Sequence, residues 1–193
     1  LGFYGQDTWK VNDQLRLTTG LRLDIPTFPD NPAANDTVAK YFSDMELKTD
    51  QMPSGNMHVS PRLGFNYDLN NENNTLFRGG VGVFSGSPKF VWMSNNYSNS
   101  GMLLKTVRTS SAVPFSLDRD DQIASLIDSS IIVPGEYQKS EINLIDKDLK
   151  FPQVLRTNLA IETELPMGLN GTFELLYTKT LNDYKYQQIN AVK

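Results

Sequence analysis

Arginines are the main side chains in this sequence that could bind a charged partner. Four of them take polar positions in segments where polar and apolar residues alternate: Arg16, Arg22, Arg62 and Arg78. Guanidinium groups placed in this way could contact an anionic ligand or a neighbouring domain. They could equally be the ordinary polar side chains of a wet surface. The residue types alone leave both interpretations open.

A second set of candidate binding residues lies in a long segment that lacks strand periodicity. Aromatic and amide side chains gather there: Trp92, Asn95, Asn96 and Tyr97. Aromatic faces beside amides suit the capture of a sugar or a peptide. We therefore predict that these four residues bind ligand from a loop. The alternative is that the aromatic residues anchor the loop's own fold.

Nothing in the sequence predicts catalysis or a bound metal. His58 is the only histidine, and cysteine, which could supply a nucleophile or a thiolate ligand, does not occur. No serine lies in the Gly-x-Ser-x-Gly motif of hydrolases. The acidic segments 118–121 and 68–72 could offer oxygens to calcium, but a helix start and a turn explain them better. We expect neither an enzyme nor a cofactor.

The composition argues against two further classes of protein. The chain has 193 residues and a net charge of −4, and its cations are interspersed with acids. It therefore lacks the concentrated basic surface that nucleic-acid binding requires. No apolar run approaches the ~20 residues of a membrane-spanning helix. A membrane barrel needs only ~10 alternating residues in each strand, so this observation leaves a barrel open.

The elements that must position these side chains are strands, because three segment pairs repeat with a period of two residues. In the clearest segment, residues 15–23, leucine takes four of the five odd positions, and arginine, threonine and glycine take the even ones. The predicted hairpins cover about residues 2–23, 57–84 and 153–179. Each hairpin has one apolar face and one polar face.

Short and long connections alternate between the predicted strands. The hairpin turns are short, whereas residues 24–56 and 85–152 form long loops, with a further strand expected over 102–109 and one helix over about 118–128. Short turns on one side and long loops on the other are typical of outer-membrane barrels. We predict an all-β fold of antiparallel up-and-down hairpins that forms part of an outer-membrane β-barrel, with long extracellular loops and one short loop helix.

The hairpin sequences resemble those of TonB-dependent outer-membrane receptors, most closely the Oar-like branch. The similarity covers all three hairpins and neither long loop. The motifs that carry it are Gln6-Asp-Thr-Trp-Lys-Val with residues 15–24, Ser60-Pro-Arg-Leu-Gly-Phe with Arg78-Gly-Gly-Val-Gly-Val-Phe, and Phe151-Pro-Gln-Val-Leu-Arg-Thr-Asn with Gly171-Thr-Phe-Glu-Leu-Leu-Tyr.

This resemblance implies a transporter that binds and imports a scarce ligand across the bacterial outer membrane. Barrels of this family have roughly 22 strands and a plugged lumen, so residues 1–193 are expected to be a partial receptor barrel. The chain also begins within an expected strand, which is consistent with a fragment. The arginines Arg16, Arg22, Arg62 and Arg78 would then face the lumen.

The same resemblance implies the partners. They are outer-membrane lipid, the TonB complex, reached through a plug domain absent from this chain, and an unknown ligand that is a peptide, a glycan or a chelate. We expect no nucleic-acid partner. The alternative to this whole interpretation is a soluble secreted β-sandwich that binds carbohydrate or protein, with its apolar faces forming a core between two sheets.

Overall fold

The computed structural model describes residues 1–69, 74–103, 112–131 and 141–189. The chain divides into two compact units. The first comprises Leu1–Phe28, Pro53–Pro88 and Lys147–Lys193, and it contains the strands. The second comprises Pro29–Met52 and Lys89–Asp146, which belong to the two long connections between strands.

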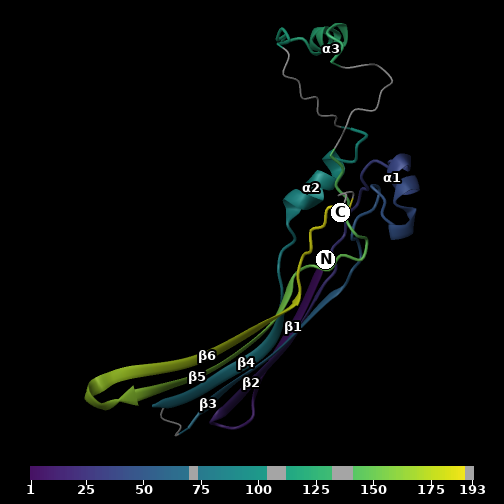
Figure 1. The fold of residues 1–193 in the computed structure, drawn as a ribbon. Coiled ribbons are helices and arrows are strands. Elements are labelled where there is room, and N and C mark those ends of the chain that lie inside the picture. Colours follow the sequence, from purple (N-terminus) through teal and green to yellow (C-terminus); the bar gives the residue numbers. More distant parts are fainter. Residues whose placement is uncertain (70–73, 104–111, 132–140, 190–193) are drawn as a thin grey trace. The chain divides into compact units, whose positions relative to one another are not determined.

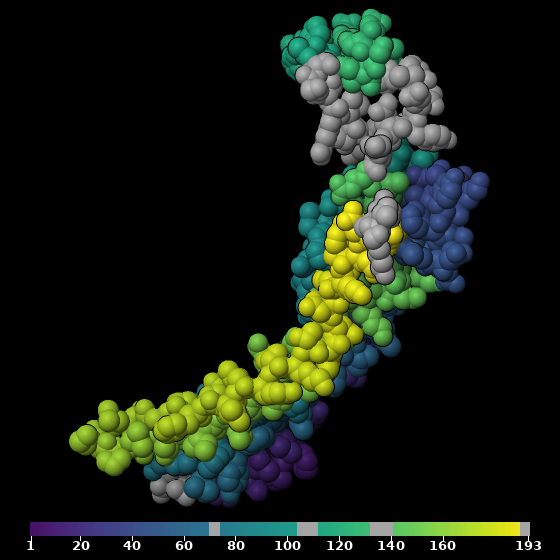
Figure 2. All heavy atoms as spheres, in the orientation of Figure 1, coloured from purple at the N-terminus to yellow at the C-terminus, as the bar shows by residue number. Residues whose placement is uncertain are grey.

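The first unit contains one antiparallel sheet of six strands, which lie in the order of the sequence (Figure 1). The strands are β1 (Gly2–Lys10), β2 (Leu15–Asp24), β3 (His58–Asp68), β4 (Thr75–Ser85), β5 (Gln153–Leu165) and β6 (Leu169–Asn182). This arrangement confirms the predicted up-and-down hairpins. The largest difference in bounds is at β6, which continues three residues beyond the predicted end. In the space-filling view β6 forms one edge of the sheet (Figure 2).

The strand register places the apolar faces of all three hairpins on the same side of the sheet. Residues that pair directly across antiparallel strands point to the same face. The pairs Leu17↔Phe65 and Phe77↔Ile161 join the hairpins on this face, and Leu159↔Leu175 lies within the third hairpin. The apolar face carries Phe3, Trp9, Leu15, Leu17, Leu21, Leu23, Val59, Leu63, Phe65, Tyr67, Phe77, Val81, Val83, Leu155, Leu159, Ile161, Leu165, Leu169, Phe173, Leu175 and Tyr177.

The apolar face is exposed over much of its area. Leu175, near the middle of β6, is 70% exposed, and Leu63 and Phe173 are also exposed. A contiguous apolar surface across six strands is larger than soluble monomers usually expose. The described strands form a single sheet, so they do not provide the second sheet that the sandwich alternative requires. A lipid bilayer would cover such a face.

Two short turns close hairpins at the same end of the sheet. Between β1 and β2 the Asn12 side chain accepts hydrogen bonds from the backbone N–H groups of Gln14 and Leu15, at 2.9 and 2.7 Å. In the same turn, Lys10 donates to Asp13 at 2.7 Å and thereby lowers the pKa of that carboxyl. The β5–β6 turn is the 3-10 helix η2 (Pro166–Gly168), in which Gly168 has a positive φ of 73°. The long connections leave the opposite end of the sheet.

The second unit contains more helix than the sequence predicted. The expected loop helix is present as α3 (Arg119–Asp128), and the Asp118 side chain caps it by accepting from the N–H groups of Asp120 and Asp121. Two further helices, α1 (Asp36–Tyr41) and α2 (Phe90–Ser98), and the 3-10 helix η1 (Ser43–Met45) were not predicted. The strand expected over 102–109 falls mostly outside the described residues, and 102 and 103 are not in a strand. None of the described helices has both the length and the apolar character needed to cross a membrane.

Candidate functional site

The second unit is held together by a buried amide from α2. The Asn96 side chain is 0% exposed, and its Nδ2 donates to the carbonyl oxygens of Thr49 and Gln51 at 3.4 and 3.3 Å. One turn earlier on the same helix face, Met93 is also buried. These contacts fix α2 to the end of the first long connection. The two long connections thus share one core.

A second set of hydrogen bonds joins the same two connections. The Asn35 side chain caps α1 through its oxygen and donates from Nδ2 to the carbonyl oxygen of Ser100 at 2.9 Å. Its backbone N–H donates to Thr49 Oγ1 at 2.8 Å, and that hydroxyl donates to the Ala33 carbonyl oxygen at 2.8 Å. Val38 is buried beside this network. The unit therefore has polar as well as apolar packing of its own.

The structure separates the four predicted loop residues into two groups. Asn96 is buried, and the Tyr97 hydroxyl donates to the carbonyl oxygen of Asp30 at 2.5 Å, so both support the loop's own fold. Trp92 is 36% exposed and packs against Lys89, whose Nζ lies 4.4 Å from the ring centroid. Asn95, three residues along the helix, is partly exposed. Trp92 and Asn95 are thus the accessible pair, and ligand binding by them stays a prediction.

All four predicted arginines point to the polar face of the sheet. Arg22 donates from Nε and a terminal nitrogen to both carboxylate oxygens of Asp24, each at 2.8 Å. Arg78 pairs with Glu162 on the neighbouring strand at 2.5 Å. The Arg62 guanidinium lies 4.5 Å above the Phe84 ring. That this face lines a lumen stays a prediction.

A fifth arginine, Arg156, lies on the same face and was not among the predicted site residues. The register pairs Gly82 with both Arg62 and Arg156, so Arg156 belongs to the same row across the sheet. The signal was present, because Arg156 alternates with Leu155 and Thr157 in a segment that was already predicted as a strand. The row itself could not be predicted, since it depends on the register between β4 and β5.

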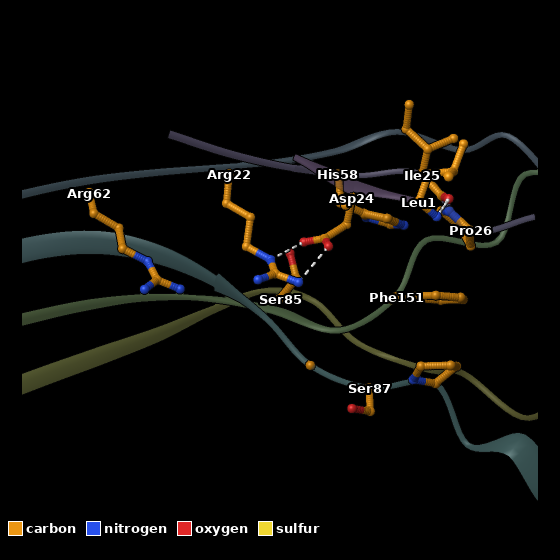
Figure 3. A pocket seen from close by; sticks show the side chains of 13 residues that line it. Leu1, Arg22, Asp24, Ile25, Pro26, His58, Arg62, Ser85, Ser87 and Phe151 are labelled. Carbon is orange, nitrogen blue, oxygen red and sulfur yellow. Dashed lines mark hydrogen bonds and ion pairs between the residues drawn. The ribbon is translucent and has the colours of Figure 1, made fainter. Parts of the chain in front are cut away.

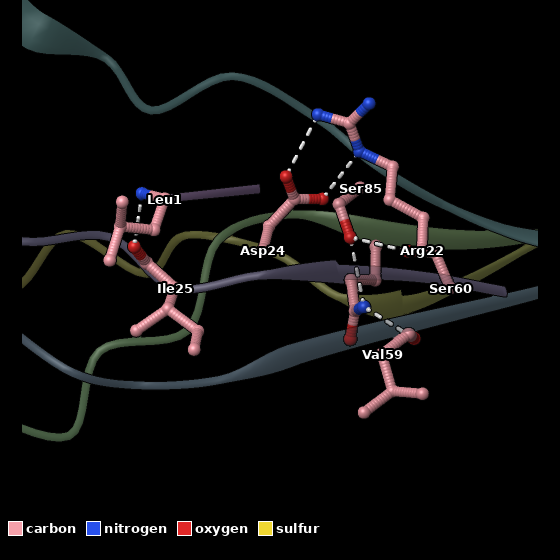
Figure 4. A network of polar contacts seen from close by, with 8 residues as sticks. Leu1, Arg22, Asp24, Ile25, Val59, Ser60 and Ser85 are labelled. Atoms are coloured by element: carbon pink, nitrogen blue, oxygen red, sulfur yellow. Dashed lines mark hydrogen bonds and ion pairs between the residues drawn. The ribbon is translucent and has the colours of Figure 1, made fainter. Parts of the chain in front are cut away.

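At the end of the sheet where the long connections leave, the polar face contains an open hollow of about 550 Å³. Figure 3 shows Arg22, Asp24, His58, Arg62 and Ser85 around it. Polar contacts hold the strands together nearby (Figure 4): the Ser60 and Ser85 hydroxyls lie 3.0 Å apart, and Gln153 Nε2 donates to Ser85 Oγ at 3.0 Å. These contacts fix the ends of β3, β4 and β5.

The one histidine has a packing role at this end of the sheet. His58 is 2% exposed, and its ring stacks on Phe151 with centroids 5.1 Å apart and planes at 13°. Phe151 directly precedes β5, so the stack joins the start of β3 to the residues before β5. Among the described residues, no group of three or more histidine, aspartate or glutamate side chains is placed to hold a metal ion.

One sheet with an apolar face, a polar face, short turns at one end and long connections at the other is the architecture of outer-membrane β-barrel proteins. The family model described as outer membrane beta barrel domain matches residues 1–193. The chain belongs to this family, and it is located in the bacterial outer membrane. Comparisons with curated proteins and with solved structures returned no match.

Proposed function

We propose that this chain is a segment of a TonB-dependent outer-membrane transporter, of the Oar-like branch, that binds and imports a scarce ligand. The observation that carries the proposal is the second unit. Two long connections fold on each other around the buried Asn96, with hydrogen bonds between residues more than 40 positions apart. A passive pore does not need its loops to fold into such a unit, whereas a receptor needs ordered loops to recognise its ligand.

The polar face supports the same proposal. In this class of protein the long loops are extracellular and the strand face opposite the lipid lines the lumen. The arginines Arg16, Arg22, Arg62 and Arg78 would then face the lumen, where a plug domain outside this chain would lie. That plug would connect the receptor to the inner-membrane TonB complex. The ligand would be a peptide, a glycan or a chelate.

Within the second unit, Trp92 and Asn95 are the residues that we assign to ligand contact. They lie three positions apart on α2, so their side chains are neighbours on one helix face. The indole offers a flat apolar surface and the amide offers both a donor and an acceptor. Asn96 and Tyr97 would support this surface from within the fold.

We predict that uptake requires energy and depends on Trp92. Cells that produce the complete protein would be given three labelled probes: a hexaglucan, a mixture of tryptic peptides and a ferric hydroxamate chelate. One probe should accumulate, and a protonophore should stop its accumulation while surface binding persists. Trp92→Ala should weaken that binding about tenfold, because exposed aromatic residues often dominate binding energy.

Two results would contradict this proposal. Accumulation that continues unchanged in the presence of the protonophore would identify a passive channel. Binding that is unaffected by Trp92→Ala would exclude the assigned contact at Trp92. The comparison variant Tyr97→Phe, which removes only the hydroxyl that donates to Asp30, reports how far binding depends on the fold of the loop.

A further inference from the structure

The polar face contains a row in which glycines alternate with arginines across neighbouring strands. Gly20 on β2 pairs with Arg62 on β3, Arg62 with Gly82 on β4, and Gly82 with Arg156 on β5. Neighbouring strands lie about 4.8 Å apart, so the Cα atoms of two residues separated by one strand are roughly 10 Å apart. Gly82 has no side chain of its own, and the Phe84 ring lies over its position and against Arg62.

A hollow of about 230 Å³ lies over this row. Four glycines line it, together with polar, aromatic and aliphatic residues. Besides the glycines, the lining residues are Gln6, Thr18, Arg62, Leu63, Val81, Phe84, Arg156 and Asn158. A Cβ atom at Gly82 would lie 3.1 Å from Arg62 Cγ and 3.1 Å from Phe84 Cε2. The absence of a side chain at Gly82 therefore lets the Arg62 side chain lie where it does.

The two arginines of this row differ from their neighbours in their partners. Arg22 and Arg78 are each paired with a carboxylate. In the described part of the chain, neither Arg62 nor Arg156 has a carboxylate within 4.0 Å. Arg62 Nε is buried without an acceptor there. Arg156 Nε has only a 3.5 Å contact with the Thr178 hydroxyl.

The surrounding charge also favours an anion. Although the whole chain has a net charge of −4, cations outnumber acids on the polar face of the strands. The cations are Lys10, Arg16, Arg22, Arg62, Arg78 and Arg156, and the acids are Asp24, Asp68, Glu162, Glu164 and Glu174. The acid close to the hollow is Glu174, which accepts a hydrogen bond from Asn158 Nδ2 at 3.5 Å.

We propose that Arg62 and Arg156 form a binding site for an oxyanion, the carboxylate or phosphate group of a small solute on the polar face. Two guanidinium groups offer several N–H donors in planar arrangements that match such groups. The hollow over the glycines is bordered by both arginines, so an anion in it could reach both. This site goes beyond ligand recognition by the loops, and it does not depend on TonB-driven transport.

Isothermal titration of the full chain in detergent micelles tests this site, with inorganic phosphate and citrate as probes and chloride as the control for ionic strength. At least one probe should bind saturably with one site per chain. Arg62→Gln and Arg156→Gln should each weaken binding about tenfold or more, because each removes a charge-assisted hydrogen bond. Gly82→Ala should also weaken binding, by displacing Arg62. The two probes distinguish a phosphate group from a carboxylate group.

Two control variants separate the site from general effects. Arg16→Gln removes a cation from the same face but outside the hollow, and Gly5→Ala adds a methyl group at a strand glycine with no atom within 4 Å of the new Cβ. Both should bind like the parent chain. The proposal is overturned if neither probe binds saturably, or if Arg16→Gln weakens binding as much as Arg62→Gln does in variants that retain the parent's circular dichroism spectrum. Failure here leaves the uptake experiment unaffected.

Discussion

Leu175→Arg should lower the free energy of unfolding in a bilayer by about 2–4 kcal/mol, the cost of an arginine at the lipid-facing midplane of an outer-membrane barrel. Leu175 lies near the middle of β6 and points to the apolar face, where it pairs with Leu159. The guanidinium would have to leave water for hydrocarbon or distort the surrounding bilayer. Urea titration of the chain folded into phosphatidylcholine vesicles would measure the change.

The adjacent residue provides a matched control. Leu176 is 62% exposed, close to the 70% of Leu175, but it pairs with Asn158 on the polar face. Leu176→Arg should change the stability by less than about 0.5 kcal/mol, as is usual for surface substitutions. The two variants share the residue type, the strand and the depth, so their difference isolates the face. Equal losses would show that the two faces meet the same environment.

Asn96→Ala should destabilise the second unit by about 1–3 kcal/mol, because the carbonyl oxygens of Thr49 and Gln51 would lose their buried donor. The effect should be local, since all of these groups belong to the long connections. Amide hydrogen exchange would detect it as faster exchange in α2, with the strands unchanged. This outcome would also establish that Asn96 supports the loop rather than touching ligand.

Asn95→Ala is the matched control for that variant. Asn95 is next to Asn96 and is partly exposed, and only its backbone carbonyl accepts a hydrogen bond, from the N–H of Asn99. Exchange in α2 should therefore stay within about twofold of the parent chain, as expected for a surface change. If both variants exchanged alike, the buried amide would not be what holds the two connections together.

The strands were predictable because each carries its own signal. In β2 leucine takes four of the five alternate positions from 15 to 23, so the element and its two faces follow from the sequence alone. The short turns could be located in the same way, since Asn12 bonds to the backbone of its own turn. The cap of α3 was also local, because Asp118 precedes two further acids at the start of the helix.

The features that the sequence did not predict depend on contacts between distant segments. Phe90-Val-Trp-Met is rich in residues that favour strands, yet it begins α2, in which Met93 and Asn96 pack inward. No pattern within that segment reveals the partners of Asn96, which lie more than 40 residues earlier. The row of Arg62 and Arg156 likewise requires the register of three strands. These features are determined by tertiary packing, so they cannot be predicted from the periodicity of the sequence.

The central claim is that the leucine face meets lipid and the arginine face meets water. Because the chain has no cysteine, single cysteines can be placed along β6 and tested in vesicles with a water-soluble maleimide. Phe173→Cys, Leu175→Cys and Tyr177→Cys should be protected, whereas Glu174→Cys and Leu176→Cys should react. Reaction of Leu176→Cys is the decisive result. Leucine is apolar, so only its position on the polar face predicts that this residue meets water. The claim would be contradicted if all five variants reacted alike. It would also be contradicted if Glu174→Cys and Leu176→Cys were protected while the other three reacted.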